Sequence, residues 1–189
     1  MARPQRPTPG RLVVSVVHSS RDALADALRL LERRFGRVIC ETIDIPHSNG
    51  HEYAEEMGDT LSRRLFSFDR MVSRESLVEI KSACHKIESQ LGDHVHDYTF
   101  RTVNIDPGIM TPDNFVMACY REYNHRVYIN EGVFAEIVLI WSRGKFCRLP
   151  WTNHDFCHPE AIDFFTRVRN GFELLERAPA VEPSDQSAY

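Results

Sequence analysis

The apolar run GVFAEIVLIW, at Gly132–Trp141, most constrains what this chain can fold into. In an extended strand, Phe134, Val138 and Ile140 would share one face, and the alternate residues would form a second apolar face. Strands that are apolar on both faces are typical of sheets covered on both sides. We therefore predict that this strand is central in its sheet and buried between two layers.

One carboxylate interrupts this run. Glu136 falls between Phe134 and Val138 on the same predicted face. A carboxylate in such a place needs a partner, because burying an unpaired charge is costly. The adjacent segment can supply one, since 125–130 and 132–142 are predicted to form the two arms of a hairpin.

Two loop lengths are compatible with this hairpin, and they give Glu136 different partners. A three-residue loop at 130–132 places Arg126 opposite Glu136, whereas a two-residue loop at 131–132 places His125 diagonal to it. We favour the three-residue loop, because a glycine that closes it in the left-handed conformation has a clear backbone reason. Either register gives Glu136 a basic neighbour.

The remaining patterns predict an α+β fold: a single domain at 11–177 with a mainly antiparallel sheet and packed helices. A disordered arm is expected at 1–10 and a disordered tail at 178–189. The other predicted strands are Leu12–His18, Arg37–Ile45 (ended by Pro46), Leu65–Asp69, Tyr98–Asp106 (ended by Pro107-Gly108), Asn114–Arg121 and Lys145–Leu149. The predicted helices run from a cap within Ser19–Asp22 to Gly36, from a Ser73 cap to Gly92, and over Pro159–Leu175.

Composition narrows the function classes. With 189 residues, a net charge of −4 and a pI near 6.1, an extensive nucleic-acid-binding surface is not expected. Five scattered cysteines fit free thiols in a reducing compartment better than a disulfide framework. No apolar run is long enough to span a membrane. We therefore expect a cytoplasmic protein without a membrane association.

Polar residues within the predicted strands mark a candidate site at the end of the sheet. Glu136, His125 and Asp106 are the candidate catalytic residues, because a carboxylate or an imidazole can transfer protons. The candidate ligand-binding residues are Arg126, Arg101, Asn104 and Tyr128. Arginine suits an anionic group, so the predicted ligand is a small anion such as a phosphorylated molecule. In the alternative interpretation, the Glu136–Arg126 pair only fixes strand register, and Asp106 only caps a turn.

Three histidine clusters contain residue types that can bind a metal ion. They are His47 and His51 with Glu52, Glu55 and Glu56; His94 and His96 with Asp93 and Asp97; and His154, Asp155, Cys157 and His158. None has the paired spacing of a zinc finger, so no metal site is predicted. The chain also has no phosphate-binding loop, dinucleotide fingerprint or nucleophile elbow, and the cofactor stays unknown.

Several short motifs resemble an uncharacterised bacterial family, the domain of unknown function 4416. They are Glu56-Met57-Gly58, Leu65-Phe66-Ser67-Phe68, Asn104-Ile105-Asp106-Pro107-Gly108, His125-Arg126-Val127-Tyr128, Gly132-Val133-Phe134-Ala135-Glu136, and Trp151-Thr152 before Asp155. The family pattern has a tyrosine where this chain has Ile109 and another where it has His154. The resemblance covers nearly all of the chain between its ends. It implies a small cytoplasmic bacterial protein and carries no established activity.

Two functions from different classes follow. The first is a binding protein or enzyme for an anionic small molecule. The second is a non-catalytic interaction module or adaptor, including a homo-oligomer, in which the acidic segment 47–59 is a partner surface. A nucleic-acid role ranks third because of the negative net charge. A cavity shared by Asp106, His125, Arg126 and Glu136 would favour the first function.

Overall fold

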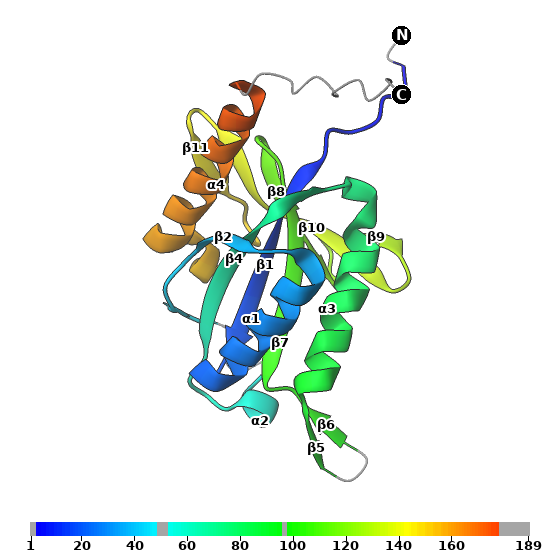
Figure 1. The fold of residues 1–189 in the computed structure, drawn as a ribbon, viewed down its shortest axis with the longest axis vertical. Coiled ribbons are helices and arrows are strands. Elements are labelled where there is room, and N and C mark those ends of the chain that lie inside the picture. The colour runs from blue at the N-terminus through cyan, green and yellow to red at the C-terminus, as the bar shows by residue number, and fades with distance from the viewer. Residues whose placement is uncertain (1–2, 49–52, 96–97, 178–189) are drawn as a thin grey trace, which may run out of the picture.

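The computed structural model describes residues 3–48, 53–95 and 98–177 (Figure 1). In chain order the elements are β1 (Gly10–His18), α1 (Arg21–Phe35), β2 (Val38–Glu41), β3 (Ile45–Pro46), α2 (Ala54–Met57), β4 (Ser62–Val72), η2 (Arg74–Ser76), α3 (Leu77–Leu91), β5 (Asp93–Val95), β6 (Tyr98–Phe100), β7 (Val103–Met110), β8 (Asn114–Cys119), β9 (Val127–Asn130), β10 (Val133–Ser142), β11 (Lys145–Arg148), η3 (His154–Cys157) and α4 (Pro159–Arg177). No helix among the described residues is long and apolar enough to cross a membrane.

The predicted fold class is confirmed: in the described part of the chain, a mainly antiparallel sheet of nine strands carries the helices, and β5 and β6 form a separate hairpin. The strand order along the large sheet is β11-β10-β8-β7-β1-β4-β2. Because β1 and β2 are both antiparallel to β4, they are parallel to each other with β4 between them. The segment β1-α1-β2-β4-α3-β7 is thus a split βαβ arrangement, which β8, β10 and β11 extend at one edge.

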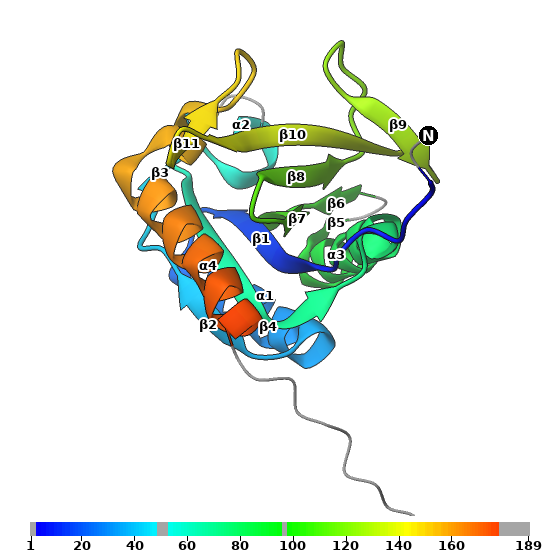
Figure 2. The same cartoon turned by 90° about the horizontal axis from the view of Figure 1, so that it is seen from above.

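The helices cover opposite faces of this sheet. α1 and α3 pack side by side on one face, where the apolar stripes of both helices meet β1, β4 and β7. On the other face, α4 contacts β2 and β4 as well as β11, at the far end of the sheet. The sheet therefore curls around α4, as the view from above shows (Figure 2).

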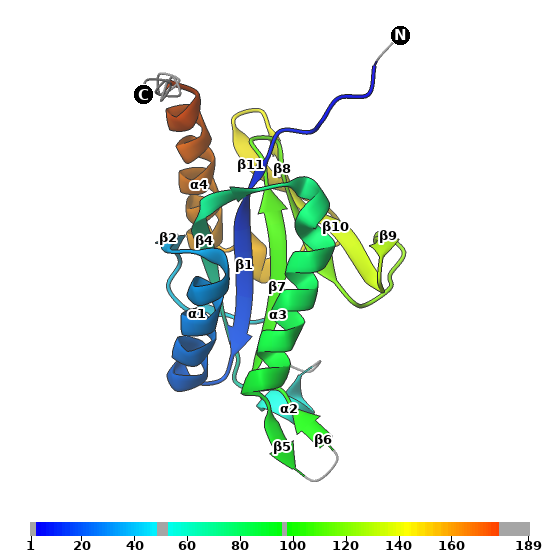
Figure 3. The ribbon, with the colours of Figure 1, turned by 45° about the vertical axis from the view of Figure 1, so that its right-hand side comes forward.

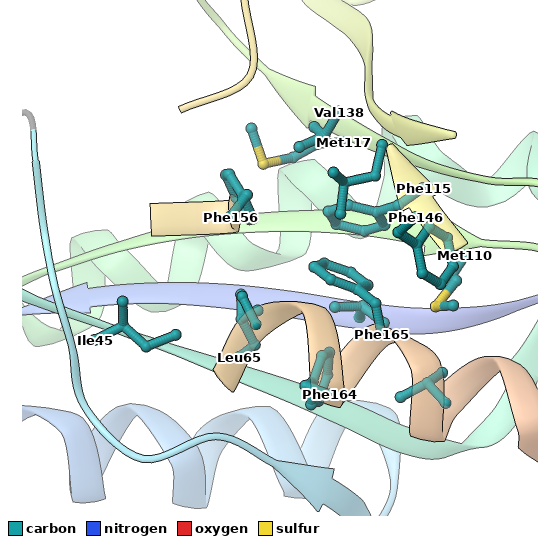
Figure 4. Close-up of a cluster of buried hydrophobic side chains, with 14 of the residues drawn as sticks. Ile45, Leu65, Met110, Phe115, Met117, Val138, Phe146, Phe156, Phe164 and Phe165 are labelled. Carbon is teal, nitrogen blue, oxygen red and sulfur yellow. The ribbon is translucent and has the colours of Figure 1, made fainter. Parts of the chain in front are cut away.

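A layer of phenylalanine rings fills the space between α4 and the sheet (Figure 4). Phe165 is fully buried at its centre. Its ring centroid lies 5.0 Å from that of Phe115, 5.3 Å from Phe164 and 5.8 Å from Phe146. Such edge-on and tilted ring contacts stabilise the packing beyond the area that they bury. We call this cluster the Phe165 layer.

The prediction that Gly132–Trp141 forms the central strand is wrong. The strand that is buried at all nine positions is β1. β10 lies next to the edge strands β9 and β11, and the side chain of Ile137 is 42 % exposed. Part of the apolar character of β10 thus faces solvent and not a second layer.

β7 continues through Pro107 and Gly108, where a strand end was predicted. In an antiparallel ladder, every second residue directs its N–H and C=O groups to the same side. The N–H and C=O groups of Ile105 point away from β1 and bond to side chains of α3. Pro107 is two residues further along the strand, so its nitrogen lies on the same side. Proline is tolerated there because pairing with β8 starts only at Gly108.

Other element boundaries also differ from the prediction. β4 spans 11 residues instead of the five at Leu65–Asp69, and Ser73 caps η2 while α3 begins at Leu77. The predicted strand at Tyr98–Asp106 is divided between β6 and β7, and Pro46 belongs to β3. β1 begins at Gly10, and Arg74 Nε donates to the carbonyl of Thr8, so the predicted arm is bound to the domain near its end. The predicted tail at 178–189 lies outside the described residues.

Candidate functional site

A cavity of about 1000 Å³ lies where two strands of the sheet separate. β7 and β8 pair only between Gly108–Met110 and Phe115–Met117, and they diverge below Gly108. The cavity walls come from α3, β7, β8 and β10, and from the segments before β9 and after β11. Figure 3 shows α3 beside β7, with β9 and β10 running away from them.

Two charged side chains of α3 bind the backbone groups of β7 where β7 is not paired with β8. Lys81 Nζ donates to the carbonyl of Ile105 at 2.9 Å, and the carboxylate of Glu88 accepts from the Ile105 N–H. These bonds replace those of a neighbouring strand, because a buried backbone group needs a partner. Burial raises the pKa of Glu88, which favours its neutral form.

Asp106 forms the centre of this wall. Its carboxylate accepts from Lys81 Nζ at 2.8 Å and from Asn104 Nδ2 at 2.7 Å. Burial alone would raise the pKa of Asp106, but the charge and hydrogen bond of Lys81, the charge of Arg63 and the hydrogen bond from Asn104 together outweigh it, so that pKa is lowered. Asp106 in turn contributes to raising the pKa of Lys81 against the opposing effect of burial. The pair is therefore fully charged at neutral pH.

Arg101 extends this network to α2. Its Nε and Nη2 bind both carboxylate oxygens of Glu56 at 2.7 Å, and its Nη1 donates to Asn104 Oδ1 at 3.1 Å. These hydrogen bonds lower the pKa of Glu56 and raise that of Arg101. Arg101 thus lines the cavity with its guanidinium already bound to side chains of the wall.

Glu136 faces the cavity from the opposite wall, and its predicted basic neighbours both contact it. Arg126 Nε lies 2.7 Å from Glu136 Oε2, and His125 Nε2 lies 3.2 Å from the same oxygen. The preferred loop is wrong, however: Val133 pairs with Asn130, which leaves a two-residue loop with positive φ at both positions. A bulge after Val133 shifts the register back, so that both basic residues reach the carboxylate.

Aromatic rings form the rim of the cavity. Tyr120, Tyr123 and Trp151 line it and are 42 %, 60 % and 36 % exposed. The Trp151 ring stacks on His125 at 5.0 Å with an interplanar angle of 8°, and its Nε1 donates to the carbonyl of Ile137. The cavity therefore has charged walls and an apolar rim.

A second charged cluster lies at the wall formed by β3, β4 and η3. Asp155 is buried and accepts from His47 Nδ1 at 2.6 Å, Ser48 Oγ at 2.6 Å and Arg63 Nε at 2.7 Å. The bonds from His47 and the charge of Arg63 hold the pKa of Asp155 far below its usual range, although burial acts in the opposite direction. Arg63 also donates to Ser15 Oγ and stacks over Phe156.

The sequence singled out much of this site but missed several of its charged residues. The cavity contains Glu136, His125, Asp106, Arg126, Arg101 and Asn104. Tyr128 is not in the lining: it is 57 % exposed on β9 and packs against Phe134. Lys81 and Glu88 were missed, although both lie in the apolar stripe of α3, where a charged residue is unexpected. Arg63 and Arg121 also line the cavity and carry no sequence signal that marks them.

The candidate metal clusters do not assemble in the part of the chain that the structure describes. Within it, no three His, Cys, Asp or Glu side chains are grouped to hold an ion. His51, Glu52, His96 and Asp97 lie outside the described residues. His47 and Asp155, which the sequence placed in two different clusters, contact each other instead.

Comparison with known proteins gives a family without an activity. A family model described as domain of unknown function (DUF4416) matches residues 8–172. No curated protein matches the chain. Since the match covers most of the sequence, the chain belongs to the DUF4416 family, as its motifs indicated.

Proposed function

We propose that the cavity binds an anionic small molecule, and that Arg126 and Lys81 supply the hydrogen bonds to its anionic group. The observation that carries this proposal is the set of N–H groups that the two side chains leave unused. Arg126 donates from Nε to Glu136 and from Nη1 to the Arg121 carbonyl, and its Nη2 has no hydrogen bond among the described residues. Lys81 uses two of its three N–H groups, for Ile105 and Asp106.

The ligand is held by directed hydrogen bonds more than by excess charge. Among the described residues, five cationic side chains line the cavity, from Arg63, Lys81, Arg101, Arg121 and Arg126. The carboxyl groups that oppose them are those of Glu56, Asp106 and Glu136, with Glu88, whose neutral form is favoured by burial. Asp155, outside the lining, balances the charge of Arg63. Charge-assisted hydrogen bonds from guanidinium and ammonium groups are strong and suit phosphate or carboxylate oxygens.

The aromatic rim favours a ligand that carries a flat or apolar part beside its anionic group. Exposed aromatic rings at the mouth of a cavity give up little further freedom when a ligand stacks on them. The volume of the cavity is within the range of sites for such molecules. If the protein is an enzyme, Asp106, Glu136 and His125 are its candidates for proton transfer.

Calorimetric titration with three probes tests this proposal. Phenyl phosphate carries both the anion and the ring, glycerol 3-phosphate carries the anion alone, and benzyl alcohol carries the ring alone. We expect phenyl phosphate to bind most tightly and benzyl alcohol most weakly. Arg126→Ala should weaken phenyl phosphate binding by roughly tenfold to a hundredfold, the value of a hydrogen bond to a charged group.

Glu136→Ala should also reduce binding, because it releases Arg126 from its position. Arg29→Ala is the matched control, since Arg29 is an exposed arginine of α1 that pairs only with Asp26 in the described structure. Circular dichroism establishes that each variant is folded. The proposal is abandoned if none of the probes binds the wild type and both site variants simply unfold.

A second function, as an interaction module or homo-oligomer, is favoured by one observation. Val127 and Ile129 of β9 and Ile137 of β10 are 69 %, 44 % and 42 % exposed. Among the described strands, β9 pairs only with β10, so the described part of the chain leaves its other edge open to a further strand. Light scattering distinguishes the candidates: a stable dimer that Val127→Lys dissociates would support this second function, and a monomer would oppose it.

A further inference from the structure

His47 carries an unpartnered nitrogen at the wall of the cavity. Four buried side-chain nitrogen or oxygen atoms of the described residues have no hydrogen-bond partner: Arg11 Nε, His18 Nε2, His47 Nε2 and Ser67 Oγ. Of these, only His47 Nε2 belongs to a residue that lines the cavity. Its ring lies next to that of Tyr53, a second lining residue, with 5.8 Å between centroids.

The position of one ring hydrogen follows from the other nitrogen. Nδ1 lies 2.6 Å from Asp155 Oδ2, and the pKa of Asp155 is far below its usual range. An ionised carboxylate can only accept a hydrogen bond, so Nδ1 carries the hydrogen and donates it. In the neutral form of this tautomer, Nε2 carries a lone pair. Arg63 Nη2 is 3.3 Å from Nδ1, but a guanidinium also only donates, so the two groups share Asp155 and do not bond to each other.

We propose that His47 is the proton acceptor of the cavity, with Asp155 as the residue that positions it. The Nε2 lone pair takes the proton from an O–H group of the bound anion, and the electron pair of that bond stays on the ligand oxygen. Asp155 then pairs with the resulting imidazolium, as the carboxylate does in other His–Asp pairs. This inference rests on the proposed function, because it needs an anionic ligand in the cavity.

His125, the histidine that the sequence favoured, is less suited to this role. Its Nε2 faces Glu136 at 3.2 Å and its Nδ1 faces Asn124 Oδ1 at 3.1 Å, so both ring nitrogens already have a neighbour. The side chain of His47 is 2 % exposed and is fixed by a carboxylate that two further side chains hold in place. Such fixation is what a positioned acid–base group requires.

Nitrogen NMR of the histidine rings in the wild-type protein tests the inference without relying on a variant that folds. His47 is assigned from the signals that disappear in His47→Gln. At pH 8 we expect a protonated Nδ1 and an unprotonated Nε2. Adding glycerol 3-phosphate, whose alcohol O–H groups keep their hydrogens at pH 8, should shift the Nε2 signal, and a protonated Nε2 in the free protein would overturn the inference.

The same titration separates this inference from the proposed function. If glycerol 3-phosphate moves the side-chain signals of Arg126 and Lys81 while His47 Nε2 stays fixed, only the role of His47 is overturned. If no cavity signal moves, the proposed function falls and this inference falls with it. His47→Gln should weaken glycerol 3-phosphate binding by about threefold to tenfold, the value of a hydrogen bond between neutral groups. His154→Gln, an exposed histidine outside the lining, should leave it unchanged.

Discussion

The Phe165 layer and the cavity adjoin each other, yet opposite kinds of side chain fill them. Met117 packs in the same apolar cluster as the phenylalanine rings and also lines the cavity. Arg63 of the cavity wall stacks on Phe156 of the layer, with 4.4 Å between its guanidinium carbon and the ring centroid. Where β7 and β8 pair, the sheet presents a continuous apolar surface to α4. Where the strands separate, charged side chains bind the freed backbone groups and leave open space between the walls. A local loss of strand pairing is thus enough to place a polar site beside a core.

The largest expected effect comes from the Phe165 layer. Phe165→Ala removes a fully buried ring that contacts four other phenylalanine rings. We expect the free energy of unfolding to fall by about 4 kcal/mol, on the scale of large-to-small core substitutions. Denaturant unfolding measures it. A loss below about 1 kcal/mol would show that the layer is not the main core on this face.

Breaking the charged cluster at Asp155 should cost slightly less. Asp155→Asn leaves the guanidinium of Arg63 buried without its counter-charge, at a cost of about 3 kcal/mol near pH 7. Folding lowers the pKa of Asp155, so its contribution is present above the unfolded pKa near 4 and is lost as pH falls below it.

The pH dependence therefore separates the two regions. The difference between wild type and Asp155→Asn should shrink between about pH 4 and pH 2, while the effect of Phe165→Ala should be the same at every pH. Denaturant unfolding at a series of pH values measures both. An Asp155→Asn effect that does not change with pH would contradict the ion-pair account.

Two carboxylates of the cavity wall should respond to pH with opposite signs. Asp106→Asn leaves Lys81 unpaired and should cost about 2 kcal/mol at pH 7. Because folding lowers the pKa of Asp106, that cost should fade below about pH 4. Glu88→Gln should cost less than about 1 kcal/mol, since the amide oxygen can still accept from the Ile105 N–H.

For Glu88 the wild type should gain stability relative to the glutamine variant as pH falls. Folding raises the pKa of Glu88, so the charged form present at higher pH is the costly one. Thermal unfolding from pH 7 to pH 5 measures the trend. An equal loss from Asp106→Asn and Glu88→Gln would contradict the assignment of charged and neutral carboxyl groups in this wall.

The smallest effect is expected outside both regions. Tyr128→Ser changes an exposed ring on β9 and should alter the free energy of unfolding by less than about 1 kcal/mol. Binding of phenyl phosphate should not change, because Tyr128 does not line the cavity. A loss of binding in this variant would restore Tyr128 to the set of ligand-binding residues that the sequence suggested.

How much the sequence could predict depends on how local each feature is. Spacing over a few residues predicts the apolar stripes of α1 and α3 and the β9–β10 hairpin. It also predicts the contact between Arg126 and Glu136. The place of β10 in the sheet depends on pairing between distant strands, which a strand's own composition does not specify. The contact between His47 and Asp155 joins residues 108 positions apart, each in a polar segment without periodicity.

Mapping the binding of phenyl phosphate on the wild-type protein tests the central claim most directly. In a titration followed by protein NMR, we predict that the shifted signals gather at Lys81, Asp106, Arg126 and Glu136, which come from α3, β7, β10 and the segment before β9 around the separated strands. Shifts confined to exposed arginines such as Arg29, or no shifts at all, would contradict the claim that this cavity is a binding site.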